Sequence, residues 1–149
     1  MSINQLYQAT IIAHNKSPRH FGILPDATHI ARGKNPLCGD AYVIYLKIED
    51  NHIKAAQFDG EGCAISKSSG SLMTDAIIGM SLTAFAKLAD AFLVMITDAS
   101  KPAEPATDLG KLRVFEGVKD YPVRVKCATL LWRAAQAAVQ ESNKIVSTE

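Results

Sequence analysis

The residues best suited to chemistry in this sequence are its three cysteines, Cys38, Cys63 and Cys127. A cysteine thiolate attacks electrophiles and binds soft metals, so a small set of cysteines is a natural starting point for a site. The count is odd and we expect no export signal, which argues against a disulfide framework. Packing, metal binding and redox chemistry remain as interpretations.

A carboxylate stands close to the first of these cysteines. Asp40 lies two residues after Cys38, on the same side of an extended segment. Three thiolates and one carboxylate complete a tetrahedral set for zinc, and sulfur ligands favour zinc or iron over magnesium or calcium. Four anions against one divalent ion give a formal charge of about −2, which calls for nearby cations or donors. The candidates are Arg124, Lys126 and Lys67.

Each of these residues also has a purely structural interpretation. A free cysteine is often a small buried apolar residue, and an aspartate after a glycine often bonds its own backbone in a turn. Basic side chains are ordinarily solvated. The histidines have no spacing typical of a metal motif, and all of them are interpreted as structural or surface residues: His14, His20, His29 and His52. Because the gaps between the cysteines are long, spacing alone leaves the metal site open.

The first half of the chain is predicted to form a helix followed by a hairpin. A capping box at Ser2 and helical spacing predict a helix to about Asn15, and the stretch over 18–36 is expected to be an extended loop. Alternating residues over 41–58, with a tight turn at Asp50 and Asn51, predict the hairpin. A third strand would come from the preceding loop, although the pattern does not place it.

The second half is predicted to be helical. One helix contains Ile65 and ends at Gly79, the next is capped by Ser81, and a long final helix begins near Cys127. The segment SKPAEPATDLGK, over 100–111, is expected to be a surface excursion. The fold class is therefore α+β, a small antiparallel sheet of about three strands packed against several helices in a single domain over 1–149.

This layout puts all three cysteines outside helices and strands. Cys38 precedes the first strand of the hairpin and Cys63 follows the second, so both should leave the sheet at one edge. Cys63 and Cys127 would lie at the starts of helices, where unpaired backbone N–H groups stabilise a thiolate. Only Cys127 must be brought to the others by tertiary folding.

Composition limits the possible functions. With 149 residues, 48% of them hydrophobic, the chain can bury a core without a metal or disulfide. A formal net charge of +1 gives no broad basic face, so we expect no nucleic acid partner. We also expect no membrane segment and no signal peptide, because long apolar runs are missing, and therefore a cytoplasmic location.

Three motifs together resemble a known family. NPLCGD, GEGCAISKSSGSLM and PVRVKCATLLW occur in the order found in the iron-sulfur cluster assembly family that includes IscU and the N-terminal part of NifU, and the similarity extends along nearly the whole chain. The resemblance implies the α+β fold. It also implies that Cys38, Asp40, Cys63 and Cys127 converge at an exposed end of the domain to bind a metal or a cluster.

Two departures resemble the SufU branch of this family. Lys126 stands where the scaffold branch has a histidine, and an extra segment spans 98–121. The branch implies a zinc-dependent sulfurtransferase that accepts persulfide sulfur from a SufS-type cysteine desulfurase on Cys38, with downstream Suf scaffold proteins as further candidate partners. Arg124 would pair with a released thiolate or with Asp40.

Two alternatives to sulfur transfer stay open. One is a scaffold on which a [2Fe-2S] cluster is assembled on Cys38, Asp40, Cys63 and Cys127 and then passed to apo proteins. The other is a structural zinc domain that only binds and activates the desulfurase.

Overall fold

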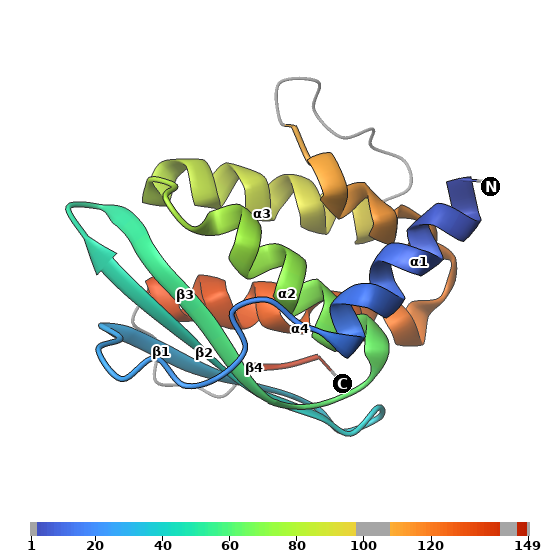
Figure 1. Ribbon diagram of the computed structural model, residues 1–149, viewed down its shortest axis with the longest axis horizontal. Coiled ribbons are helices and arrows are strands. Elements are labelled where there is room, and N and C mark those ends of the chain that lie inside the picture. Colours follow the sequence, from blue (N-terminus) through green and yellow to red (C-terminus); the bar gives the residue numbers. More distant parts are fainter. Residues whose placement is uncertain (1–2, 98–107, 141–145, 149) are drawn as a thin grey trace.

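The computed structural model describes residues 3–97, 108–140 and 146–148, and in it one face of a β-sheet is covered by helices (Figure 1). The strands of this sheet are β1 (His29–Asn35), β2 (Asp40–Glu49), β3 (His52–Glu61) and β4 (Val146–Ser147). Their order is β3-β2-β1-β4, with antiparallel pairing except between β1 and β4. The α+β fold class predicted from the sequence is confirmed.

The predicted hairpin is formed by β2 and β3. Asp50 and Asn51 at its turn have positive φ angles of 53° and 60°, as a two-residue turn with the twist of a hairpin requires. Inward-facing residues such as Ile44 and Phe58 are fully buried, whereas the residues that alternate with them along each strand are more exposed. The alternation of apolar residues therefore fixes which face of the sheet meets the helices.

Two layers of helix cover that face. α2 (Ala64–Ile77) and α4 (Pro122–Val139) pack directly on the sheet, and α3 (Leu82–Thr97) and the 3-10 helix η1 (Gly110–Asp120) pack on α4 from the far side. α1 (Ile3–Lys16) lies along α2. The stacked rings of Phe92 and Trp132, 4.3 Å apart between centroids, join α3 to α4 inside this core.

Helix boundaries agree with the sequence except at α4. The Ser81 hydroxyl caps α3 by accepting the Ala84 N–H at 3.0 Å, and α2 ends just before Gly79, both as predicted. The final helix, however, begins at Pro122, so the prediction that it starts near Cys127 was wrong. A proline at the first helical position suits a helix start, because the missing N–H has no partner there in any case.

Two further differences concern the sheet. The extended loop expected over 18–36 ends in a regular strand, β1, which supplies the third strand. The short strand β4 was not expected, and it makes the sheet four-stranded. The predicted cap at Ser2 and most of the excursion over 100–111 lie outside the described residues.

The outer edge of β3 is bonded at two places to segments that are not strands. Near one end, the Gly22 N–H donates to the Phe58 carbonyl at 2.8 Å. Near the other, the Ile53 N–H donates to the Met80 carbonyl, also at 2.8 Å. Much of the free edge of the hairpin is thereby paired within the chain.

Among the helices that the structure describes, none is long and apolar enough to cross a membrane.

Candidate metal centre

Cys38 lies in the short loop that joins β1 to β2. The ladder between these strands closes with Asn35 opposite Asp40, and the Cys38 N–H donates to the Asn35 carbonyl at 3.1 Å. Gly39 completes the turn with a φ of 68°, a conformation that glycine adopts without strain. The loop thus presents a partly buried Cys38 beside Leu37, which is 63% exposed.

Cys63 is the N-cap of α2. It follows β3, which pairs with β2 at Ala41 and Glu61, so Cys38 and Cys63 emerge at the same edge as predicted. The Cys63 sulfur accepts the Ser66 N–H at 3.5 Å, which satisfies one of the free donors at the helix start.

Cys127 differs from its predicted position. It lies in the second turn of α4 and is only 1% exposed, so it is neither in a loop nor at the start of a helix. Burial, the neighbouring Cys38 thiol and the negative charges of Cys63 and Asp40 raise the pKa of Cys127. Of the two cysteines expected at helix starts, only Cys63 is found at one.

The structure brings three of the four predicted ligands into one cluster. Ligand atoms of Cys38, Asp40 and Cys127 all lie within 4.8 Å of one another, and the Cys127 and Cys38 sulfurs are 3.0 Å apart. Cys63 lies next to this group, since its N–H donates to Asp40 Oδ1 at 2.9 Å, although its sulfur is not among the clustered atoms. A set rich in thiols with one carboxylate has the chemistry that zinc and iron prefer, so the residues fit such an ion.

Asp40 is held by a buried hydrogen-bond network. Its Oδ1 accepts the Cys63 N–H and the Ser66 hydroxyl, the latter at 3.0 Å, and the Tyr42 hydroxyl lies 2.9 Å from Ser66 Oγ. Burial raises the pKa of Tyr42 well above its usual range, so its hydroxyl stays protonated. Gly62 packs against this network, because an added Cβ would lie 2.5 Å from both Asp40 Oδ1 and the Tyr42 oxygen.

Sequence reasoning missed the two hydroxyl residues of this network. A serine three residues after Cys63 was the available signal for Ser66, because that spacing is typical of a side chain at the start of a helix. Tyr42 carried no such signal, since it also fits the alternation of a buried strand.

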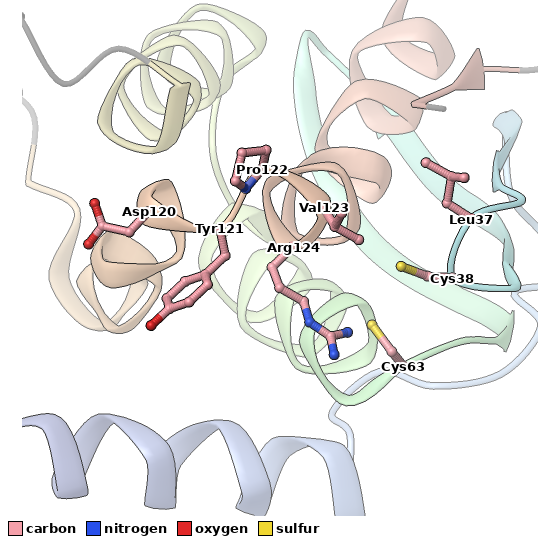
Figure 2. A pocket seen from close by; sticks show the side chains of 8 residues that line it. All are labelled: Leu37, Cys38, Cys63, Asp120, Tyr121, Pro122, Val123 and Arg124. Atoms are coloured by element: carbon pink, nitrogen blue, oxygen red, sulfur yellow. The ribbon is translucent and has the colours of Figure 1, made fainter.

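A cleft of about 560 Å³ opens over Cys38 and Cys63. Figure 2 shows that the Arg124 side chain extends toward Cys63. Leu37, Tyr121 and Val123 line the same cleft, and more than half of each of these apolar residues is exposed. The centre is therefore open on one side, where Cys38 and Cys63 face the cleft, and closed on the other, where Cys127 is buried.

Of the three cations considered from the sequence, Arg124 lies at the cleft. The Lys67 ammonium lies over the Phe21 ring, 5.3 Å from its centroid. Lys126 does not line the cleft, and its backbone carbonyl accepts the Thr148 hydroxyl at 3.1 Å. Arg124 remains the candidate partner for an anion at the open side.

The chain is similar to known proteins along most of its length. The family model described as NifU-like N terminal domain matches residues 6–145. The chain belongs to this family. The resemblance inferred from the three cysteine motifs is thus confirmed.

Individual relatives carry two different names. The iron-sulfur cluster assembly scaffold protein IscU of Streptococcus pyogenes serotype M1 is 39% identical over 94% of this chain and 86% of its own. The zinc-dependent sulfurtransferase SufU of Bacillus subtilis is 36% identical over 93% of this chain and 92% of its own. Among solved structures, a putative iron-sulfur cluster assembly scaffold protein for the SUF system from Fervidobacterium islandicum AW-1 has 30% identity and a TM-score of 0.83, covering 93% of this chain and 99% of that one.

Proposed function

We propose that this protein is a zinc-dependent sulfurtransferase of iron-sulfur cluster assembly, which accepts persulfide sulfur on Cys38. The observation that carries the proposal is the asymmetry of the cluster. Cys38 lies on the loop between β1 and β2, at an open cleft, while Asp40 and Cys127 are buried behind it. A reactive sulfur acceptor must be reachable, and its supporting ligands need not be. The SufU relative supports the same assignment by its name.

Cys38, Asp40, Cys63 and Cys127 would hold the ion. A bound zinc ion would keep its thiolate ligands deprotonated and protect them from oxidation. The network around Asp40 fixes that carboxylate in place, and the N-cap position of Cys63 places its sulfur against the N–H groups of α2. The protein therefore supplies ligands from a loop, a strand, the N-cap of α2 and the interior of α4.

The chemical step is a thiol exchange at sulfur. The Cys38 thiolate attacks the terminal sulfur of a protein persulfide, a new S–S bond forms, and the S–S bond of the donor breaks. The donor cysteine leaves as a thiolate, and Cys38 becomes the persulfide, so no external oxidant or reductant is needed. Arg124 at the cleft would pair with the anionic sulfur or with Asp40.

The proposed donor is a cysteine desulfurase of the SufS type, with downstream Suf scaffold proteins as further candidate partners. The exposed apolar rim formed by Leu37, Tyr121 and Val123 surrounds the acceptor cysteine and gives a surface for docking. In this role the protein is a sulfur acceptor and an activator of the desulfurase, not a free-standing catalyst.

The test combines the protein with a SufS-type desulfurase and free cysteine. Wild-type protein should raise alanine production and carry a persulfide on Cys38, detected by mass spectrometry. Cys38→Ala should abolish both effects, and Arg124→Ala should weaken them, whereas the matched exposed-cation variant Lys87→Ala should behave as wild type. Full stimulation by Cys38→Ala would refute sulfur acceptance at this residue.

A scaffold function is the second candidate, favoured by the name of the Streptococcus pyogenes relative. In that case the same ligands would hold a [2Fe-2S] cluster. Metal analysis of protein purified without added metal distinguishes the two: near-stoichiometric zinc supports sulfur transfer, and brown, iron-bearing protein supports the scaffold.

A further inference from the structure

Asn35 is a buried polar residue that the proposed function does not use. It is the last residue of β1, directly opposite Asp40 in the ladder with β2, and it has no exposed surface. Residues opposite each other in a ladder point to the same face of the sheet. Asn35 therefore shares the inner face with Asp40, at the end of the sheet where the cysteines lie.

The side-chain nitrogen of Asn35 contacts two of the proposed ligands at once. Nδ2 lies 3.4 Å from Asp40 Oδ2 and 3.5 Å from the Cys127 sulfur. An amide nitrogen carries two hydrogens, so it has one donor for each acceptor. Asn35 thus joins β2 to α4 on the closed side of the centre.

The amide oxygen of Asn35 shows that the ligands need a hydrogen-bond donor at this position. Oδ1 is buried and has no hydrogen-bond partner among the described residues. Rotating the amide by half a turn would place this acceptor against a carboxylate oxygen and a sulfur, which would repel it. The orientation is therefore set by Asp40 and Cys127, and the donor faces the ligands although the acceptor goes unpaired.

We infer that Asn35 is a positioning residue of the metal centre, which orients Asp40 Oδ2 and the Cys127 sulfur and supplies N–H donors to the buried side of an anionic ligand set. This inference rests on the proposed zinc site. Partners outside the ligand set commonly orient ligands and tune the metal.

The distribution of charge explains why a neutral donor suits this position. Arg124 lies at the cleft and faces the open side. On the closed side, the Asn35 amide is the nitrogen donor that the structure gives to the Cys127 sulfur. An N–H···S bond draws electron density from a thiolate and so lowers the repulsion between adjacent sulfurs.

The test uses cobalt(II) as a spectroscopic substitute for zinc, together with zinc affinity measured by chelator competition. Asn35→Leu keeps a comparable volume and removes both donors. Its thiolate-to-cobalt charge-transfer band should move to longer wavelength, because the Cys127 sulfur becomes richer in electrons, and its zinc affinity should fall by about 10 to 100-fold. Asn35→Ala, which is smaller, should show the same shift if the leucine variant does not fold.

A matched control is Thr74→Ala. The buried Thr74 hydroxyl donates to the carbonyls of Gly70 and Ser71 in its own helix, α2. This substitution should lower stability and leave the cobalt spectrum unchanged. An unshifted band in the folded Asn35 variants, with or without a loss of affinity, would overturn the positioning role. Failure of wild-type protein to bind zinc or cobalt would instead refute the metal centre itself, and with it both proposals.

Discussion

At the scale of single residues, the two oxygens of Asp40 have different surroundings. Oδ1 accepts hydrogen bonds from the Cys63 N–H and the Ser66 hydroxyl, whereas Oδ2 faces Asn35. Oδ1 therefore carries two hydrogen bonds from the protein and Oδ2 carries one, so Oδ2 keeps the greater capacity to accept a further partner.

The space around the Asp40 carboxylate is filled, and the substitution Gly62→Ala tests how tightly it is packed. A methyl group in Gly62→Ala would meet the Ser66 oxygen at 2.6 Å, with Asp40 and Tyr42 just as close. We expect the free energy of unfolding to fall by about 1–3 kcal/mol, as for other overpacked sites, and zinc to dissociate faster because Asp40 is displaced. Urea unfolding and zinc release to a chromogenic chelator measure the two effects.

Gly117→Ala in η1 is the matched control, because nothing lies within 4 Å of its added methyl group. It should change neither measurement appreciably. If the two variants had the same free energy of unfolding and the same rate of zinc release, the network around Asp40 would be able to make room for the methyl group, contrary to the argument from packing.

Short motifs in the sequence located Cys38, Asp40 and Cys63, because all three lie at or near the ends of one predicted hairpin. Asn35 and Tyr42 could not be assigned in the same way. The contacts of Asn35 with the ligands and of Tyr42 with Ser66 depend on the ladder register and on the packing of α2 and α4, and neither is encoded in local spacing.

At the scale of elements, the start of α4 shows why Cys127 was misplaced. The residues after Pro122 include Val123 and Val125, and β-branched residues favour extended structure. Tertiary packing overrides this preference, since α4 lies against β1, β2 and α2 along its length. A strand of two residues such as β4 has no pattern to detect, so the fourth strand could not be predicted either.

The contact between α1 and α2 predicts a dependence of stability on pH. His14 Nδ1 lies 2.6 Å from Ser71 Oγ, which also accepts the Arg19 N–H. Burial, then the charges of Arg19 and Lys111, lower the pKa of His14 below 6.5, and the opposite charge of Asp75 only partly offsets them. The unfolded chain therefore binds the proton more readily than the folded protein.

It follows that His14 costs no stability above its unfolded pKa of 6.5 and destabilises the fold progressively as the pH falls below that value. His14→Gln removes the titrating group. Between about pH 7.5 and 5, wild-type protein should lose stability relative to the variant, as measured by urea unfolding at each pH. Parallel curves for the two proteins over this range would contradict the argument.

At the scale of the whole molecule, most of the hydrophobic core lies outside the metal centre. Buried residues from the sheet and from α2, α3, η1 and α4 form one hydrophobic cluster, and none of the four proposed ligands is a member of it. A core of this size stabilises a domain without a metal.

Removal of the ion should therefore leave the protein folded. Free zinc at 1,000 times its dissociation constant adds about 4 kcal/mol to the free energy of unfolding. The chelated protein should therefore melt at a lower temperature, but still cooperatively. Circular dichroism and calorimetry before and after chelation measure this. Loss of all secondary structure would support the alternative of a structural zinc domain.

The bonds along the outer edge of β3 have a consequence for behaviour at high concentration. An open edge strand is a template on which another chain can add, and such addition leads to aggregation. Here Gly22 and Met80 occupy hydrogen-bonding groups of that edge. Addition of another chain along this edge is therefore discouraged, and the folded protein should stay dispersed at concentrations where an open hairpin edge would aggregate.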